Sequence, residues 1–480
     1  MNKLRLNTLI QTSVITVIFV LMFTYGYSAS WFILPVTISF YVCLYHVLEY
    51  IKRDDIFSVK GVVWCLFLYF FSVSPILHYI NDYYYHGFAI KLYTWDLYFS
   101  IWSWLNLVGL LIYAKVISYT SNRKRSYHSI PYNSIDDLKL ERVLYIGCIF
   151  LVLSSVMQYY VYAKFGGISG YILAKEIDGV DAFKGMGLMV LVSESFPIIF
   201  ATIIVVLFRK KGVKSNHVIY CSIFIFLIVK IIFGGLAGSR SNIIWGLFWF
   251  AGMIHIFVKP FSKKQLTLAL IFLMAFMAIY GVYKKHRSSF SEAITSSGIS
   301  DNNYYNSTNP FIAILLTDFS RADIQSYEIF SQSVGAYSNL RLGETYLNSI
   351  NRIIPIGKDY FRFDSKTQAG TEIIFHSEGD YSTRLYGLVG EFMLNFPYHL
   401  YPIVFFPFAL LVIYIDNFRK RKKDDDTTLL IYPFFVNLCI ILLIADSDNV
   451  LYFILKNGFI PIIFILIISK LSFKRRLYAS

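Results

Sequence analysis

The residues best suited to acid–base chemistry gather in one polar stretch of the second half of the chain. His376 and Glu378 stand two positions apart, and Arg384 and Glu391 follow within one short segment. A histidine or a carboxylate can accept a proton from a reacting hydroxyl, and an arginine can stabilise negative charge. Glu391, Glu378 and His376 are therefore candidate catalytic residues, with the alternative that they belong to an ordinary solvated loop.

Residues 234–242, with the sequence GGLAGSRSN, offer a different chemistry. The three glycines allow the backbone to approach a ligand closely. Arg240 is the only charged residue of this turn, and it stands at the expected start of a helix, where free backbone N–H groups favour anions. We expect Arg240 to bind an anion; the alternative is a simple contact with phospholipid headgroups.

Two ionisable residues, Glu194 and Lys230, fall inside long apolar segments. Charges in such segments are costly and indicate paired or functional groups. Both residues lie roughly 10–12 Å from the outer ends of their segments at a rise of about 1.5 Å per residue. An ion pair between them is one interpretation, and contact of Lys230 with a substrate is the other. Lys456, near the outer end of the last apolar segment, is expected to extend toward the membrane surface.

Long apolar runs dominate the chain, which is 56% hydrophobic and 15% charged, whereas a soluble domain is about 25% charged. A helix needs roughly 20 apolar residues to cross the hydrocarbon layer, and its backbone groups cannot stay unpaired there. The sequence therefore predicts an all-α integral membrane protein of about 12 transmembrane helices. The predicted spans cover residues 8–26, 31–50, 59–80, 95–117, 142–163, 187–208, 218–238, 242–258, 266–283, 399–417, 429–446 and 450–470.

Lysine and arginine cluster at every second gap between these runs. Because basic residues hold a terminus and short loops in the cytoplasm, both termini and all the clusters are expected on that side. The net charge of +14 then reflects topology rather than nucleic-acid binding, since the charge is spread around one membrane face. We expect the first run to be a retained anchor rather than a cleaved signal. The clusters lie at 3–5, 52–60, 123–142, 209–214, 259–264, 419–423 and 470–476.

The predicted organisation is a first group of nine helices over residues 1–283, a large outward loop over 284–398, and three helices over 399–480. The loop holds ten lysines and arginines, and long translocated loops are exempt from the charge rule. Loops of this length in a compact fold are usually functional. The pattern of apolar residues predicts helices at 310–330 and at 385–396, the second ending before Pro397.

Several kinds of site have no signature in the sequence. There is no Ser-His-Asp arrangement, no phosphate-binding loop that ends in GK[ST], and no metal-ligand spacing, including among the five cysteines. We therefore expect chemistry that needs neither a metal ion nor a cofactor.

Four short segments stand out beside the predicted spans: GSRSN at 238–242, GETYL at 343–347 with NRIIP at 351–355, GLVGEFMLNF at 387–396 and, more weakly, FGGI at 165–168. With these segments the chain resembles the Wzy-type polymerases that build O-antigen and capsular polysaccharide in the bacterial inner membrane. The resemblance covers most of the chain and includes the twelve predicted spans and the large outward loop before the last three.

The resemblance implies a GT-C-like polymerase or ligase architecture and a glycosyl transfer at the periplasmic face. A glycan on undecaprenyl diphosphate would be the donor, and one newly flipped lipid-linked repeat unit would be the acceptor. A chain-length-determining co-polymerase is the implied partner. Arg240 would act in catalysis together with a base, which would be Glu391, His376 or Glu378. The residues expected to bind the substrate or its diphosphate are Arg287, Arg384, Arg341, Arg352 and Lys230.

Two other functions are compatible with a similar number of spans. An O-antigen ligase would share the large loop but would transfer the finished glycan to another acceptor. A lipid-linked glycan flippase would need no long loop and would show related halves, whereas this chain has one dominant loop and no detectable repeat.

Overall fold

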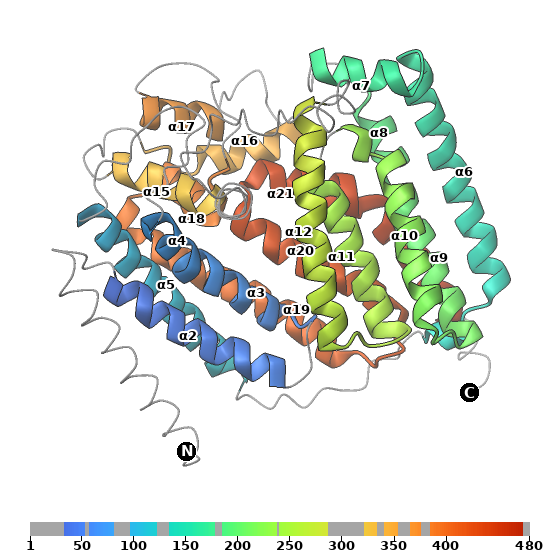
Figure 1. Cartoon of the computed structure of the whole chain (residues 1–480), viewed down its shortest axis with the longest axis horizontal. Coiled ribbons are helices and arrows are strands. Elements are labelled where there is room, and N and C mark those ends of the chain that lie inside the picture. The colour runs from blue at the N-terminus through green and yellow to red at the C-terminus, as the bar shows by residue number, and fades with distance from the viewer. Residues whose placement is uncertain are drawn as a thin grey trace. The chain divides into compact units, whose positions relative to one another are not determined.

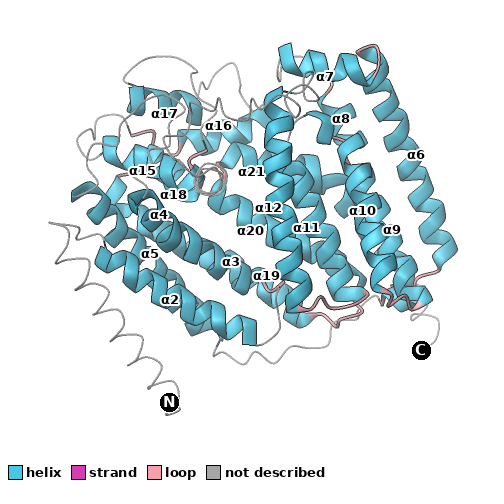
Figure 2. Ribbon diagram, viewed as in Figure 1, coloured by secondary structure: helices cyan, strands magenta, loops and turns pink. Residues whose placement is uncertain are grey.

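The computed structural model describes residues 33–52, 57–80, 97–121, 134–177, 185–237, 240–286, 321–333, 340–353, 365–375 and 385–473. Throughout these residues the secondary structure is helical, and the only β-type pairing is an isolated bridge between Ser134 and Asp426. Figure 2 shows helices joined by loops, with no strand in the described part of the chain.

Eight of the described helices are long and apolar enough to cross a membrane, judged by length and composition. The described residues are therefore helical, as predicted, and include several segments suited to spanning a membrane. The first predicted run, 8–26, lies outside the described residues, and the total of twelve spans and their orientation stay predictions. The eight cover Ile33–Lys52, Val59–Leu77, Tyr98–Tyr119, Leu140–Lys164, Gly187–Lys211, Tyr398–Arg421, Thr427–Ile444 and Ser447–Leu471.

Three further helices match the seventh, eighth and ninth predicted runs. Helices α10 (Asn216–Ile232) and α11 (Arg240–Phe257) are apolar but shorter than the eight spans. Helix α12 (Lys263–His286) continues without a break over the ninth run. The apolar runs therefore located the starts of these helices to within three residues, whereas α10 ends six residues before the predicted end of its run.

The chain divides into two compact units that do not follow its linear order. The first unit comprises residues 1–125, 303–416 and 439–451, so it joins N-terminal helices to most of the predicted outward loop. Its described elements (Figure 1) are α2 (Ile33–Lys52), α3 (Val59–Leu68), η1 (Tyr69–Val73), α4 (Ser74–Ile80), α5 (Leu97–Ser121), α15 (Arg321–Ser333), α16 (Glu344–Ile353), α17 (Lys366–Phe375), α18 (Gly387–Asn395), η9 (Tyr398–Val404), most of α19 (Phe405–Arg421), the end of α20 (Tyr432–Ile444) and the start of α21 (Ser447–Phe453).

Close contact between α5 and the segment η9–α19 organises the core of the first unit. A Cβ atom at Gly109 would lie 2.5 Å from the Phe405 ring, so only glycine lets this ring pack against α5. The buried Tyr401 hydroxyl donates to Asn106 Oδ1 at 2.8 Å and to the Trp102 carbonyl oxygen at 2.9 Å. These bonds satisfy a polar group that would otherwise be costly to bury.

The second unit comprises residues 126–302, 417–438 and 452–480. A turn at Glu194 and Ser195 separates two helices inside one apolar segment, and Pro197 follows near the start of the second helix. Besides α10, α11, α12 and the start of α20, the second unit contains η2 (Ile135–Asp137), α6 (Leu140–Lys164), α7 (Ile168–Ile177), α8 (Gly187–Ser193), α9 (Phe196–Lys211), η4 (Gly235–Ala237), η10 (Thr427–Ile431), η11 (Ile454–Phe459) and α22 (Ile460–Phe473).

The predicted helices of the outward loop are present where the structure describes them. Helix α15 covers the end of the stretch predicted at 310–330, whereas residues 310–320 lie outside the described part. Helix α18 lies within the stretch predicted at 385–396. Phe396 after it is extended, as expected for a residue before a proline.

An ion pair inside the first unit was not foreseen from the sequence. Lys60 of α3 lies 2.8 Å from Asp416 of α19, and the two side chains are 5% and 9% exposed. The sequence assigned Lys60 to a basic cluster at a helix end, which implies a solvated side chain. Because each charge is withdrawn from water, each depends on the other for compensation.

We predict that Lys60→Met strongly lowers the thermal unfolding midpoint in detergent, since it leaves the Asp416 carboxylate buried and unpaired, a loss of about 3–5 kcal/mol. Lys60→Met combined with Asp416→Leu should recover most of that loss. Lys52→Met, at an exposed lysine of α2, is the matched control and should unfold like the wild type. Equal midpoints for Lys60→Met and Lys52→Met would contradict the assigned ion pair.

Candidate functional site

The Glu391 carboxylate joins three helices of the first unit. It is 3% exposed. One oxygen accepts a hydrogen bond from the backbone N–H of Ser447 at 2.6 Å. The other accepts from the Ser447 hydroxyl at 2.5 Å and from the Thr345 hydroxyl at 3.0 Å. Glu391 on α18 thereby connects α16 to the start of α21, and both of its oxygens receive donors.

Asn395 lies one helical turn after Glu391 and fixes the segment before α16. Its amide nitrogen donates to the Thr345 hydroxyl at 2.7 Å and to the Glu391 carbonyl oxygen at 2.8 Å. Its amide oxygen accepts from the backbone N–H groups of Gly343 at 3.0 Å and Thr345 at 3.3 Å. Two of the segments that carry the sequence resemblance, 343–347 and 387–396, are thus in direct contact.

A glycine allows α15 to approach this helix closely. A Cβ atom at Gly390 would lie 2.8 Å from the Tyr386 Cβ atom and 3.0 Å from the Ser326 hydroxyl. The Ser326 hydroxyl donates to the Tyr386 carbonyl oxygen at 2.5 Å. The start of α18 is therefore fixed by α15, which positions Glu391 one residue further along.

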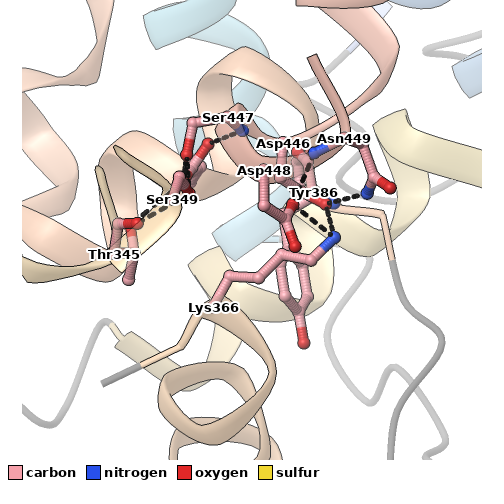
Figure 3. Close-up of polar contacts among 10 residues, drawn as sticks. Thr345, Ser349, Lys366, Tyr386, Asp446, Ser447, Asp448 and Asn449 are labelled. Atoms are coloured by element: carbon pink, nitrogen blue, oxygen red, sulfur yellow. Dashed lines mark hydrogen bonds and ion pairs between the residues drawn. The ribbon is translucent and has the colours of Figure 1, made fainter. Parts of the chain in front are cut away.

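A second group of charges lies beside Ser447. Lys366 on α17 forms ion pairs with Asp446 and, at 3.3 Å, with Asp448. Asp446 also accepts from the backbone N–H of Tyr386 at 2.7 Å. Figure 3 shows the Lys366 side chain reaching between Asp446 and Asp448, while Ser447 lies on the side of Thr345 and Ser349. We call Lys366, Asp446, Ser447 and Asp448, together with Glu391 and Asn395, the Glu391 cluster.

Burial and neighbouring charges bring the pKa of the Glu391 carboxyl close to neutral pH. Burial raises the pKa of Glu391 to about 7, and the nearby charge of Asp446 adds to this effect against the hydrogen bonds from Ser447 and Thr345. Burial also raises the pKa of Asp446, although Lys366 opposes it. Burial would lower the pKa of Lys366, but the charges of Asp446 and Asp448 outweigh burial and raise it. A carboxyl with a pKa near 7 suits general acid–base chemistry.

A separate charged cluster lies in the second unit. Glu194, 3% exposed, forms an ion pair with Lys456 at 2.9 Å. It also accepts a hydrogen bond from the Asn242 amide at 2.7 Å. The pairing of Glu194 with Lys230 anticipated from the sequence is therefore replaced by pairing with Lys456, which turns inward instead of extending toward the membrane surface. Lys456 lies in the π-helical turn η11, a distortion found frequently at functional sites.

Two glycines, Gly234 and Gly246, lie against the side chains of this second cluster. Gly234 has a φ of +113°, and a Cβ atom there would lie 2.7 Å from the Glu194 carboxyl carbon. Lys230 is 1% exposed and interacts electrostatically with Glu194 and Lys456. A Cβ atom at Gly246 would lie 3.1 Å from Lys230 Cε, so α11 leaves room for the lysine. Two lysines and one carboxylate give this group a net positive charge, which suits an anion.

The structure brings together some of the residues singled out in the sequence. Glu391 and Lys230 lie in the two clusters, and Arg240 is the first residue of α11, two positions before Asn242. Arg341 pairs with Glu372 of α17, so its charge is already matched. Arg352 belongs to α16. The side chains of Arg240 and Arg352 lie outside the described part, as do the whole residues Arg287, His376, Glu378 and Arg384.

The residues that sequence reasoning missed are Asp446, Ser447, Asp448 and Lys366. The first three had a detectable signal, because residues 445–449 (ADSDN) interrupt two apolar runs with two acidic residues in a very short gap. Lys366 had none, since its partner Asp446 lies 80 residues away in the sequence.

Comparison with protein-family profiles, with curated proteins and with solved structures finds no match to this chain. No group of histidine, cysteine, aspartate and glutamate side chains that could hold a metal ion is present among the described residues.

We predict that Glu391→Gln changes how stability depends on pH. Because the pKa of Glu391 in the folded protein is about 7 and the ordinary value for a glutamate is about 4.3, the folded state holds the proton more tightly. Wild-type stability should fall as pH rises from about 4.5 to 7, by roughly 3 kcal/mol from this group, and Glu391→Gln should lack that component.

Thermal unfolding midpoints in detergent at pH 5, 6, 7 and 8 measure this effect as the difference between the wild type and the variant. A constant offset is expected from the altered hydrogen bonds of the amide. Glu141→Gln, at an exposed glutamate of α6, is the control and should keep the wild-type pH dependence. A difference between wild type and Glu391→Gln that does not change with pH would contradict a raised pKa.

Proposed function

We propose that this chain is a glycosyltransferase that polymerises undecaprenyl-diphosphate-linked repeat units into O-antigen or capsular polysaccharide. The observation that carries the proposal is the meeting of segments 343–347 and 387–396 around the buried Glu391 carboxylate. Both segments belong to the resemblance with Wzy-type polymerases. Their direct contact supports a common role.

The proposal includes a topology. Twelve spans would place both termini in the cytoplasm of a bacterium and residues 284–398 on the periplasmic side of its inner membrane, where flipped lipid-linked glycans arrive. The eight described spans and the three further helices support a multi-pass protein. The Glu391 cluster lies at the ends of spans rather than within them, since Ser447 begins the last described span.

In the proposed reaction an acceptor hydroxyl attacks the anomeric carbon of the donor sugar. The new glycosidic bond forms while the bond between that carbon and the lipid diphosphate breaks. The hydroxyl proton passes to a base, for which Glu391 is the best-supported residue because its pKa is near 7. Glu391 already accepts two hydroxyl donors at 2.5 and 3.0 Å, from Ser447 and Thr345. An acceptor sugar hydroxyl would take the place of one of them. His376 and Glu378 stay alternative bases.

The leaving diphosphate needs compensation for the negative charge that develops on it. We propose that cationic side chains supply this compensation. Arg240 and Lys230 are proposed for this role, because Lys230 belongs to a group with net positive charge and Arg240 begins the helix that carries Asn242 of the same group. Arg287, Arg384 and Arg352 stay further candidates. Arg341 would first have to leave Glu372.

We predict that deletion of the gene leaves single repeat units on the cell surface, measured by gel analysis of surface glycans. Polymer retained on the carrier lipid would instead indicate a ligase, and units facing the cytoplasm would indicate a flippase. Long surface chains that persist unchanged in the deletion strain would reject the proposed function. Restoration of chains by the wild-type gene is the control.

We predict that Arg240→Ala abolishes polymer in the complemented deletion strain while the protein still inserts into the membrane at the wild-type level. Lys264→Ala, at an exposed lysine of α12, is the matched control and should restore full-length chains. Full polymer with Arg240→Ala would remove Arg240 from the site.

We predict that Glu391→Gln slows elongation in isolated membranes by about 10²–10⁴-fold, the usual contribution of a general base. Ser447→Ala should retain more activity but move the alkaline rise of the rate to higher pH. The Ser447 hydroxyl lowers the pKa of Glu391 in the wild type, so its removal raises that pKa. A merely structural role of Glu391 would leave the pH midpoint of Ser447→Ala where the wild type has it.

A further inference from the structure

Helix α16 has its polar and apolar faces reversed relative to a helix that faces water. Thr345 and Ser349 on one face are 1% and 4% exposed. Leu347 and Ile350 on the other face are 47% and 48% exposed. A surface helix in water buries its apolar stripe and exposes its polar side chains. The outer face of α16 therefore suits an apolar environment.

Leu342, just before α16, repeats the pattern at a strained position. Its φ is +49°, in the left-handed region that glycine or asparagine adopts at lower cost. The conformation is fixed because the Leu342 N–H donates to the Asn395 carbonyl oxygen at 3.0 Å. The side chain is nevertheless 75% exposed. An apolar residue that is both strained and exposed indicates a contact outside the described protein.

Hydrogen bonds place α16 at the level where apolar spans begin. The Ser349 and Ser447 hydroxyls are 2.7 Å apart and hydrogen-bonded. Ser447 is the first residue of the span Ser447–Leu471. On the other side of Glu391, α18 ends three residues before the span Tyr398–Arg421. The helix is therefore attached to the ends of two membrane-spanning segments, where headgroups meet acyl chains.

We propose that α16 is an interfacial helix whose outer face, formed by Leu342, Leu347 and Ile350, contacts the boundary between headgroups and acyl chains of the bilayer. Amphipathic helices of this kind lie in the membrane plane with their apolar face buried about 5–10 Å deep. Here the polar face binds Glu391 and Ser447 instead of water. The inference depends on the membrane-spanning segments and not on the proposed reaction. The lipid surface would then form a boundary of the Glu391 cluster.

Depth-dependent fluorescence quenching tests this contact. In a variant with the five cysteines replaced by alanine, single cysteines at positions 347 and 350 are labelled with a nitrobenzoxadiazole dye and studied in nanodiscs of phosphatidylethanolamine and phosphatidylglycerol. We expect lipids with a nitroxide high on the acyl chain to quench both labels several-fold more than aqueous iodide does.

Two further positions calibrate the measurement. A label on Tyr414→Cys in the span α19, where the native side chain is 68% exposed, should be quenched by the nitroxide lipid. A label on Asp424→Cys, where the native side chain is 83% exposed, should be quenched by iodide. Labels at 347 and 350 that behave like the label at 424 would overturn the proposal in favour of a water-facing helix. Labels that neither quencher reaches would overturn it in favour of a protein segment that covers α16.

Photochemical labelling of the unmodified protein covers the case in which the labelled variants do not fold. A phosphatidylcholine with a diazirine on its acyl chain is incorporated into the nanodiscs, and adducts are located by mass spectrometry. We expect adducts on the peptide that contains Leu342, Leu347 and Ile350. Adducts on α19 without any on this peptide would contradict the proposal.

Discussion

The Glu391 carboxylate is the interaction on which the organisation of the first unit's polar region depends. It receives donors from Thr345 of α16 and from both the hydroxyl and the backbone N–H of Ser447. These segments lie 46 and 56 residues from it in the sequence. Burial of this carboxylate is costly unless the donors are present, so the requirement that assembles the three helices also brings the pKa of Glu391 near neutrality. Structure and candidate chemistry thus have the same physical origin.

The sequence predicted the helices well because a run of about 20 apolar residues has few other stable structures in lipid. Helices α2 and α6 match runs identified from composition to within two residues at each end, and α9 covers the second part of another run. The interruptions inside runs were not predictable in the same way. Glu194 at the break and Lys456 in the π-helical turn pair within the second unit, and Gly458 leaves room for the Phe434 ring. Such features depend on partners distant in sequence rather than on local periodicity.

The candidate site was predictable only in part, since residue types are visible in a sequence and their pairing is not. Glu391 was identified as a carboxylate near the start of a span, but no local pattern indicated that Thr345 and Ser447 bind it. Arg341 was expected from the sequence to be a cation that binds the substrate, yet it forms an ion pair with Glu372. Similarly, the sequence suggested Lys230 as the partner of Glu194 and placed Lys456 toward the membrane surface, but in the structure Lys456 pairs with Glu194. The sequence alone shows which of these residues lie in or near apolar spans. Which charged residues pair with one another is visible only in the folded structure.

The side of the membrane that the Glu391 cluster faces tests the account most directly, because a reaction with flipped lipid-linked glycans requires the periplasmic side. A sandwich fusion within residues 287–300 can carry either alkaline phosphatase, which is active only outside the cytoplasm, or a green fluorescent protein, which fluoresces only inside it. A fusion within residues 122–133 serves as the cytoplasmic reference. The account predicts phosphatase activity without fluorescence for the first fusion and the opposite for the second. Fluorescence from the fusion within 287–300 would contradict the proposed reaction.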